Sequence, residues 1–162
     1  MLELTLEPLT KAAFAAFGDV IETENTEHFA INGGSTQRYH DLAKLQHSGS
    51  HSAMICSIFR GQAFELPLTI SMMEHHPFGS QLFMPLSDRP YVVVVASAGA
   101  LKEQYIRAFL AQGNQGVNYH SGVWHHPLIS LQQTSDFLVI DRSGKEANCV
   151  EKSLSAAIRL IA

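Results

Sequence analysis

Two short segments of the chain gather side chains that can do chemistry. Residues 72–83 read MMEHHPFGSQLF and residues 116–128 read GVNYHSGVWHHPL, so they hold five of the nine histidines. Imidazole and carboxylate groups bind divalent transition metals. They also exchange protons near neutral pH, because a free histidine has a pKa of about 6.5. The segments therefore predict one polar site for metal binding or acid–base chemistry, if the fold brings them together.

Prolines and side-chain alternation indicate how these residues are presented. A residue that precedes proline is restricted to extended conformations, so His76 and His126 are expected at strand ends. Side chains alternate along an extended segment, so Glu74 and His76 share one face while His75 points to the other. His125 and His126 diverge in the same way, and the sequence leaves open which of them faces inward. We expect a cavity lined by Glu74, His76, His120 and one of His125 and His126.

Plainer explanations exist for the same residues. A histidine beside another histidine and a proline is often a hydrogen-bonded residue at the rim of a fold. Trp124 is the only tryptophan and lies inside the second segment. It is interpreted as a packing wall in preference to a surface on which a ligand stacks.

The rest of the chain reads as a series of short strands. Thr10–Gly18 is predicted to be a short helix, with Thr10 as its N-cap and Gly18 as its left-handed stop. Thr23–Gln37 is polar and is predicted to be a loop. The texture of short β-rich runs between turns is typical of an all-β sandwich or barrel, and no helices alternate with the strands. The predicted strands are Met54–Phe59, Leu66–Met73, Ser80–Met84, Tyr91–Ala96, Ile106–Leu110, Gln115–His120, Leu128–Gln132 and Asp136–Asp141.

Composition excludes several classes of function. The 162 residues suit one domain, and a net charge of −4 with scattered Lys and Arg gives no basic stripe for nucleic acid. The most apolar run, YVVVVASAGAL, is far shorter than the roughly 20 residues that span a bilayer. The N-terminus lacks the pattern of a secretory signal, so a cytoplasmic location is expected. Cys56 and Cys149 are expected to be reduced thiols, with Cys56 in the core.

The second histidine segment resembles a known metal-site motif. His120-x-Gly-x-x-His125 matches the second cupin motif, Pro-x-Gly-x-x-His, with His120 in place of the proline and His125 at the metal-ligand position. The first cupin motif, His-x-His followed by Glu, is degraded around His76, and Gln81 stands about where the glutamate would be. The chain thus resembles a divergent cupin with an altered ligand set.

A wider pattern resembles the bacterial ureidoglycolate lyase family. It comprises INGG, STQ and RYHDL around residues 32–42, LPLTISMMEHHPFGSQLFMPL at 66–86, VVVVA, IRAF, NQGVNYHSGVWHHPL and DFLVIDR. The resemblance implies one cupin domain over residues 1–162, an all-β barrel of the jelly-roll type with a short N-terminal helix. It also implies a carbon–nitrogen lyase of allantoin degradation that splits ureidoglycolate into glyoxylate and urea. A homodimer and a divalent metal, with nickel suggested, complete the expectation.

That reaction assigns tasks to the candidate residues. A carboxylate must be held, and Arg38 and Arg60 are the candidates, with Arg107 a weaker third. Proton transfer or metal ligation is expected of His76, His120 and His125, with Glu74 as a further catalytic group. Gln81 is expected to support them, while Asn32 and Tyr119 hydrogen-bond the ureido group. The alternatives are a cupin-like protein that binds small carboxylates without catalysis and a different cupin enzyme.

Overall fold

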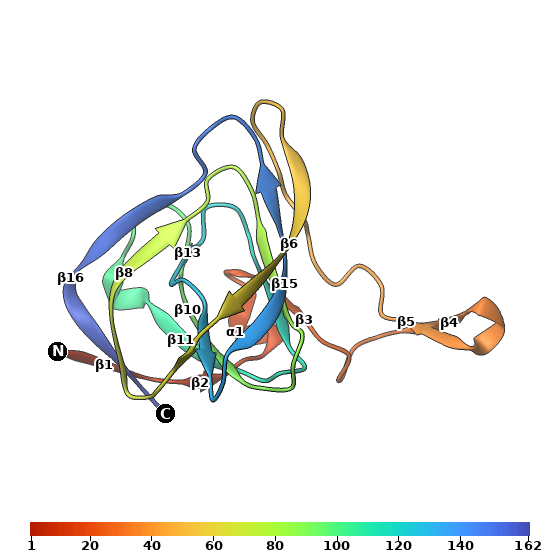
Figure 1. The fold of residues 1–162 in the computed structure, drawn as a ribbon, viewed down its shortest axis with the longest axis horizontal. Helices are drawn as coiled ribbons and strands as arrows, with labels where there is room; N and C mark the ends of the chain where they lie inside the picture. Colours follow the sequence, from red (N-terminus) through yellow and green to blue (C-terminus); the bar gives the residue numbers. More distant parts are fainter.

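The computed structural model describes residues 1–162, and strands dominate it (Figure 1). The one α-helix is α1 (Lys11–Phe14), and two 3-10 turns are η1 (Asn32–Gly34) and η2 (Glu103–Tyr105). The strands are β1 (Leu2–Thr5), β2 (Glu7–Pro8), β3 (Gly18–Ile21), β4 (Phe29–Ile31), β5 (Thr36–Arg38), β6 (Ala53–Gly61), β7 (Ala63–Phe64), β8 (Leu68–His75), β9 (Gln81–Pro85), β10 (Tyr91–Ala96), β11 (Arg107–Ala111), β12 (Gly116–Tyr119), β13 (Trp124–His125), β14 (Ile129–Leu131), β15 (Ser135–Ser143) and β16 (Val150–Ile161).

The strands form three sheets. A nine-stranded sheet runs β1-β16-β8-β13-β10-β11-β2, with β14 and β7 attached beside β10. A five-stranded sheet runs β3-β12-β9-β15-β6, and β4 pairs only with β5. The all-β, single-domain prediction is confirmed, but the sheets are not closed into a barrel and a cupin jelly roll is not shown. The single α-helix, α1, has only four residues, so none of the helices could span a bilayer.

Two apolar cores explain why β10 reads as an unbroken run of valines. Tyr91, Val93 and Val95 belong to a core between the two large sheets. Val92 and Val94 belong to a second core on the other face, enclosed by strands of the nine-stranded sheet itself. A strand that is buried on both faces has no reason to alternate apolar with polar residues.

All eight predicted strands are present, but the helix prediction needs correction. Thr10 caps α1 as predicted, because its hydroxyl accepts a hydrogen bond from the Ala13 amide at 3.1 Å. The helix ends at Phe14, however, and Gly18 begins β3 instead of stopping the helix. A Cβ at Gly18 would lie 1.8 Å from the Asn118 carbonyl oxygen, so this glycine permits the close pairing of β3 with β12.

Two other predictions were wrong. Cys56 is exposed, because β6 is the end strand of its sheet and none of its residues is buried. The predicted loop over residues 23–37 contains β4, η1 and the first two residues of β5. We call residues 29–38 the arm. In Figure 1 the arm projects from the body, on the side away from β8 and β16.

Candidate active site

Pairing of β13 with β8 creates the central cluster of the site. His125 is the register partner of Glu74, so both side chains leave the sheet on the same face. Glu74 Oε1 lies 3.5 Å from His125 Nε2 and 3.8 Å from His76 Nε2. Glu74, His76 and His125 come from two segments about fifty residues apart, and the structure brings one ligand atom of each close to the others.

His125 is the inward-facing member of the second His-His pair. Its side chain is only 2% exposed and its ring stacks on Tyr119, with ring centroids 4.2 Å apart and an interplanar angle of 4°. Burial lowers the pKa of His125, which favours the neutral ring. The Val123 carbonyl lies 3.1 Å from Nδ1 and can only accept, so Nδ1 carries the proton. The buried Nε2 therefore keeps its lone pair and has no hydrogen-bond partner.

His76 is held from both sides of its ring. Nδ1 lies 2.6 Å from the Asn148 carbonyl oxygen, and Nε2 lies 3.0 Å from Gln81 Oε1. Gln81 is oriented in turn, because its amide donates to Asp141 Oδ2 at 3.1 Å. Both ring nitrogens of His76 thus face oxygen acceptors, and the two hydrogen bonds are complete only when each nitrogen carries a proton. This arrangement fixes the orientation of the His76 ring beside Glu74.

The carboxylate of Glu74 sets the charge of the cluster. The close contact with the His125 ring, and then the neighbouring His76 ring, hold the pKa of Glu74 below its usual value against the opposing effect of burial, so the side chain is ionised at neutral pH. The Cys149 thiol donates to Glu74 Oε2 at 3.5 Å. Burial and the nearby Glu74 carboxylate raise the pKa of Cys149 to about 11, so this cysteine is a thiol.

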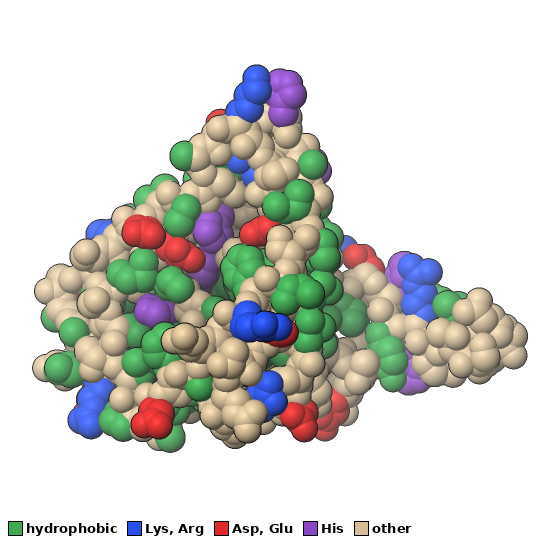
Figure 2. Space-filling model, in the orientation of Figure 1, with side chains coloured by type: hydrophobic (Ala, Val, Ile, Leu, Met, Phe, Trp, Pro, Cys, Tyr) green, Lys and Arg blue, Asp and Glu red, His purple; other side chains and the backbone are tan.

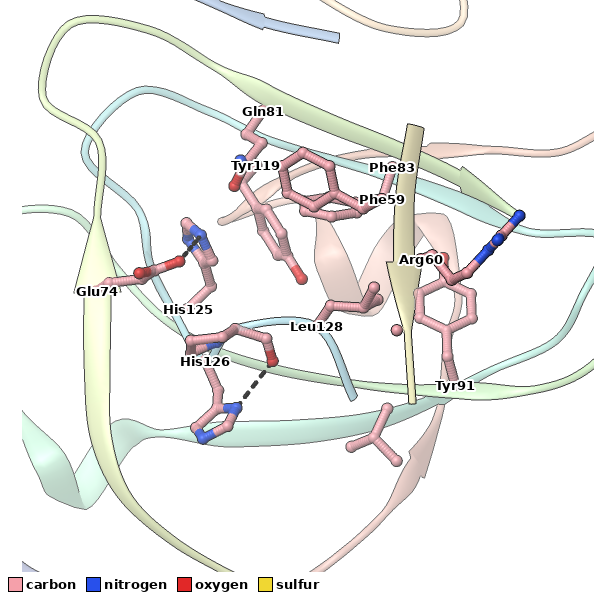
Figure 3. A pocket seen from close by; sticks show the side chains of 13 residues that line it. Phe59, Arg60, Glu74, Gln81, Phe83, Tyr91, Tyr119, His125, His126 and Leu128 are labelled. Atoms are coloured by element: carbon pink, nitrogen blue, oxygen red, sulfur yellow. Dashed lines mark hydrogen bonds and ion pairs between the residues drawn. The ribbon is translucent and has the colours of Figure 1, made fainter. Parts of the chain in front are cut away.

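A cavity of about 350 Å³ opens beside this cluster, between the two large sheets. In Figure 3 the rings of His125 and Tyr119 lie at one end, and the Tyr119 hydroxyl points into the cavity. The other walls are mostly apolar, so the cavity suits a small molecule with a polar reacting end. The remaining lining residues are Phe59, Arg60, Gly61, Gln81, Phe83, Tyr91, Val92, His126, Pro127 and Leu128.

The donor set fits a divalent metal ion. A neutral His125 Nε2 and an ionised Glu74 oxygen, 3.5 Å apart, both present electron pairs and repel each other unless a positive charge lies between them. One ligand atom from each of Glu74, His76 and His125 falls within 4.8 Å of the others. A proton or a transition-metal ion would satisfy this arrangement. Binding His76 would require Nε2 to leave Gln81.

Three predicted residues lie apart from the cluster. His120 Nε2 is 2.9 Å from Asp19 Oδ2, in a different depression of the surface, and His120 is no part of the potential metal group. Asn32 and Arg38 lie in the arm and are exposed.

Arg60 lies at the rim of the cavity, but its charge is engaged elsewhere. The guanidinium forms two hydrogen bonds with Asp136, at 2.8 and 3.1 Å, and the side chain is 74% exposed. In Figure 3 it points away from the cavity. Arg107, the weaker candidate, is paired with Glu7.

Trp124 and His75 pack on the face opposite to the cluster, whereas His126 borders the cavity. Trp124 is buried in the second core and donates to the Gly99 carbonyl at 2.8 Å, which confirms it as a packing wall. His75 packs against Trp124, with ring centroids 4.3 Å apart. His126 lines the cavity, and its Nδ1 lies 2.8 Å from the Pro127 carbonyl oxygen.

Sequence reasoning missed the residues that orient His76. Asn148 lies two residues before the start of β16, a strand that pairs with β8 and was not predicted. The alternating run KSLSAAIRLI was the available signal for β16. Asp141 accepts the hydrogen bond from the Gln81 amide. It lies in a predicted strand, but nothing in the sequence indicated that Gln81 would be its partner.

The chain is similar to known proteins over most of its length. The family described as ureidoglycolate lyase matches residues 1–160. A ureidoglycolate lyase of Brucella anthropi is 59% identical over 91% of this chain and 88% of its own length. One of Pseudomonas fluorescens is 52% identical over 99% and 97%, and one of Pseudomonas syringae pv. syringae is 54% identical over 93% and 89%. The chain belongs to the ureidoglycolate lyase family.

Proposed function

We propose that this protein cleaves ureidoglycolate into glyoxylate and urea, as a carbon–nitrogen lyase of allantoin degradation. The single observation that supports the chemistry is the buried Glu74–His125 pair, with His76 beside it, at the polar end of a small cavity. Family membership supports the substrate. No observation favours a protein that binds small carboxylates without catalysis.

The reaction needs one proton removed and one returned. The carbinol hydroxyl of the substrate loses its proton as the carbon–oxygen double bond forms, and the electron pair of the breaking carbon–nitrogen bond leaves with the urea nitrogen. Glu74 and His125 accept the hydroxyl proton, because a proton between these two atoms relieves their repulsion. His76 gives a proton to the nitrogen, since both its ring nitrogens face acceptors. The proton count balances.

The rest of the cavity positions the substrate. The Tyr119 hydroxyl is placed to hydrogen-bond the ureido group, and burial raises the pKa of Tyr119, so it acts as a neutral donor. Gln81 supports His76 through its hydrogen bond with Asp141 behind it. His120 contacts Asp19 outside the cavity, so in this proposal it stabilises the fold and takes no part in proton transfer.

A divalent ion, with nickel suggested by the family resemblance, would be held by Glu74 and His125, with His76 as a third ligand. When bound, it would supply Lewis-acid stabilisation of the developing oxygen charge. A bound ion would take the position between Glu74 and His125 that the accepted proton would otherwise occupy. Metal analysis of the purified protein therefore distinguishes a metal-binding role of these two residues from a proton-accepting role. The cytoplasmic location stays a prediction.

Release of urea and of glyoxylate from racemic ureidoglycolate tests the proposal. The purified protein is assayed as isolated, after chelation, and after addition of nickel. We expect both products in equal amounts. Absence of both products under all three conditions would refute the proposed function.

A further inference from the structure

The candidate site lacks a group that its proposed substrate requires. Ureidoglycolate and glyoxylate both carry a carboxylate, which proteins hold most effectively with an arginine. The only cationic lysine or arginine at the cavity is Arg60, which is paired with Asp136 and directed away. Glu74, and Asp141 behind Gln81, add negative charge at this end. Within one chain, therefore, no guanidinium or ammonium group is directed into the cavity to hold the substrate carboxylate.

One arginine of the chain is uncommitted. Arg38, in β5 of the arm, is exposed and takes part in no ion pair. Every other arginine donates to an acceptor of the chain: Arg60 to Asp136, Arg89 to Ser135, Arg107 to Glu7, Arg142 to Glu146, and Arg159 to Glu3. Arg38 is therefore the arginine that is free to receive a carboxylate.

The arm that carries Arg38 is not part of either large sheet. Its two strands pair with each other and with no other strand, and Phe29 in β4 is 49% exposed. Gly33 and Gly34 form its tip with positive φ angles, and an added Cβ would meet nothing there. An isolated two-stranded hairpin is marginally stable in water. A defined arm of this kind needs a partner surface.

A matching unpartnered surface borders the cavity. The β6 strand ends the five-stranded sheet, so its outer edge has no pairing strand. Ile58 is 62% exposed, and Ile55 and Phe59 are also exposed; Phe59 lines the cavity. Figure 2 shows hydrophobic side chains gathered beside the hollow that contains histidines, with the arm extending to the side. Apolar surface and an open strand edge at one place favour docking of another chain.

We propose that the arm of one copy docks beside β6 of a second copy and places Arg38 at the mouth of that copy's cavity, where it binds the substrate carboxylate. This proposal rests on the proposed function. The second copy is the occupant that fits, because the free cation of the arm complements the negative cavity. A two-fold axis makes the exchange reciprocal, so each site of the dimer is composed of both chains.

A heterodimer of two defective chains tests the shared site. Arg38→Ala and Glu74→Gln chains carry different affinity tags, are co-expressed, and the mixed dimer is isolated through both tags. Each parent dimer is expected to lose activity, and Arg38→Ala should lower kcat/KM about 10- to 100-fold. The mixed dimer contains one site with an intact Glu74 and an intact arm, so it should recover about half of the wild-type activity.

The opposite result is equally clear. If Arg38 served the cavity of its own chain, neither site of the mixed dimer would be intact, and its activity would stay at the level of the parents. The matched control is Gln37→Ala, at the residue next to Arg38 in the arm. The Gln37→Ala dimer should be as active as the wild type, and a mixed dimer of Gln37→Ala with Glu74→Gln should have about half of that activity, because one of its two sites is intact. Wild-type protein without any lyase activity would refute the proposed function before any dimer is mixed.

Sedimentation measures the docking itself without activity. We expect the wild-type protein to be a dimer. Phe29→Asp should raise the dissociation constant of this dimer at least about tenfold, because the substitution introduces a charge into an apolar contact. Phe29 is exposed in the single chain, so the variant should remain folded by circular dichroism. A wild-type monomer, or an unchanged dissociation constant for folded Phe29→Asp, would overturn the proposal.

Discussion

Replacing Glu74 with glutamine separates catalysis from folding most sharply. The change keeps the shape of the side chain and removes the charge that faces His125 Nε2 at 3.5 Å. The new amide can donate a hydrogen bond to that buried nitrogen, which has no partner in the wild type. The substitution therefore removes a proton acceptor from the site and at the same time satisfies an orphaned atom.

The two effects differ greatly in size. A positioned acid or base contributes about 10²- to 10⁴-fold to a rate. That range corresponds to about 3 to 5 kcal/mol of activation free energy, at about 1.4 kcal/mol for each factor of ten. The free energy of unfolding should change by less than about 1 kcal/mol, because one hydrogen bond replaces one electrostatic contact.

Urea release gives kcat and KM, and urea denaturation followed by circular dichroism gives the free energy of unfolding. The matched control is Glu151→Gln, which removes the exposed carboxylate opposite Glu74 on β16. The control should be nearly as active as the wild type. If Glu74→Gln kept more than about a tenth of the wild-type kcat, the acid–base argument would be refuted. The same conclusion would follow if its activity fell only as far as its folded fraction.

Three further substitutions test the placement of individual residues. His125→Ala should abolish turnover and also lower the free energy of unfolding by about 2 to 4 kcal/mol, because it removes a buried ring stacked on Tyr119; an unchanged denaturation midpoint would contradict this packing. Arg60→Ala should leave KM within about twofold, because its exposed ion pair with Asp136 is weak and lies outside the cavity; a large rise in KM would return Arg60 to the site. His120→Ala should leave kcat within about threefold, because its partner is Asp19 in a separate depression; a loss as large as that of Glu74→Gln would show a catalytic role.

The placement of His125 shows what tertiary structure added to a correct sequence pattern. Alternation predicted that His125 and His126 diverge, but it could not say which one faces Glu74. β13 is only two residues long, so no run of apolar residues marks its buried face. Its pairing with β8, fifty residues earlier, fixed the register and placed His125 opposite Glu74.

Long-range partners were equally invisible. His120 fits a cupin-like spacing, yet its ring meets Asp19, because β3 pairs with β12 across about one hundred residues. The hydrogen bond from His76 to Asn148 depends on β16 returning beside β8. Spacing along the chain describes neighbours on one strand and does not describe which strands become neighbours.

The sequence by itself determined the family, the all-β class, the eight predicted strands and the two segments that carry the site, because local alternation and residue type are properties of short stretches. Only the tertiary structure decided that Glu74, His76 and His125 meet, that Arg60 is committed to Asp136, and that Arg38 stands on a projecting arm. These facts depend on strand register and on the direction of loops, which are set by contacts between residues far apart in the chain.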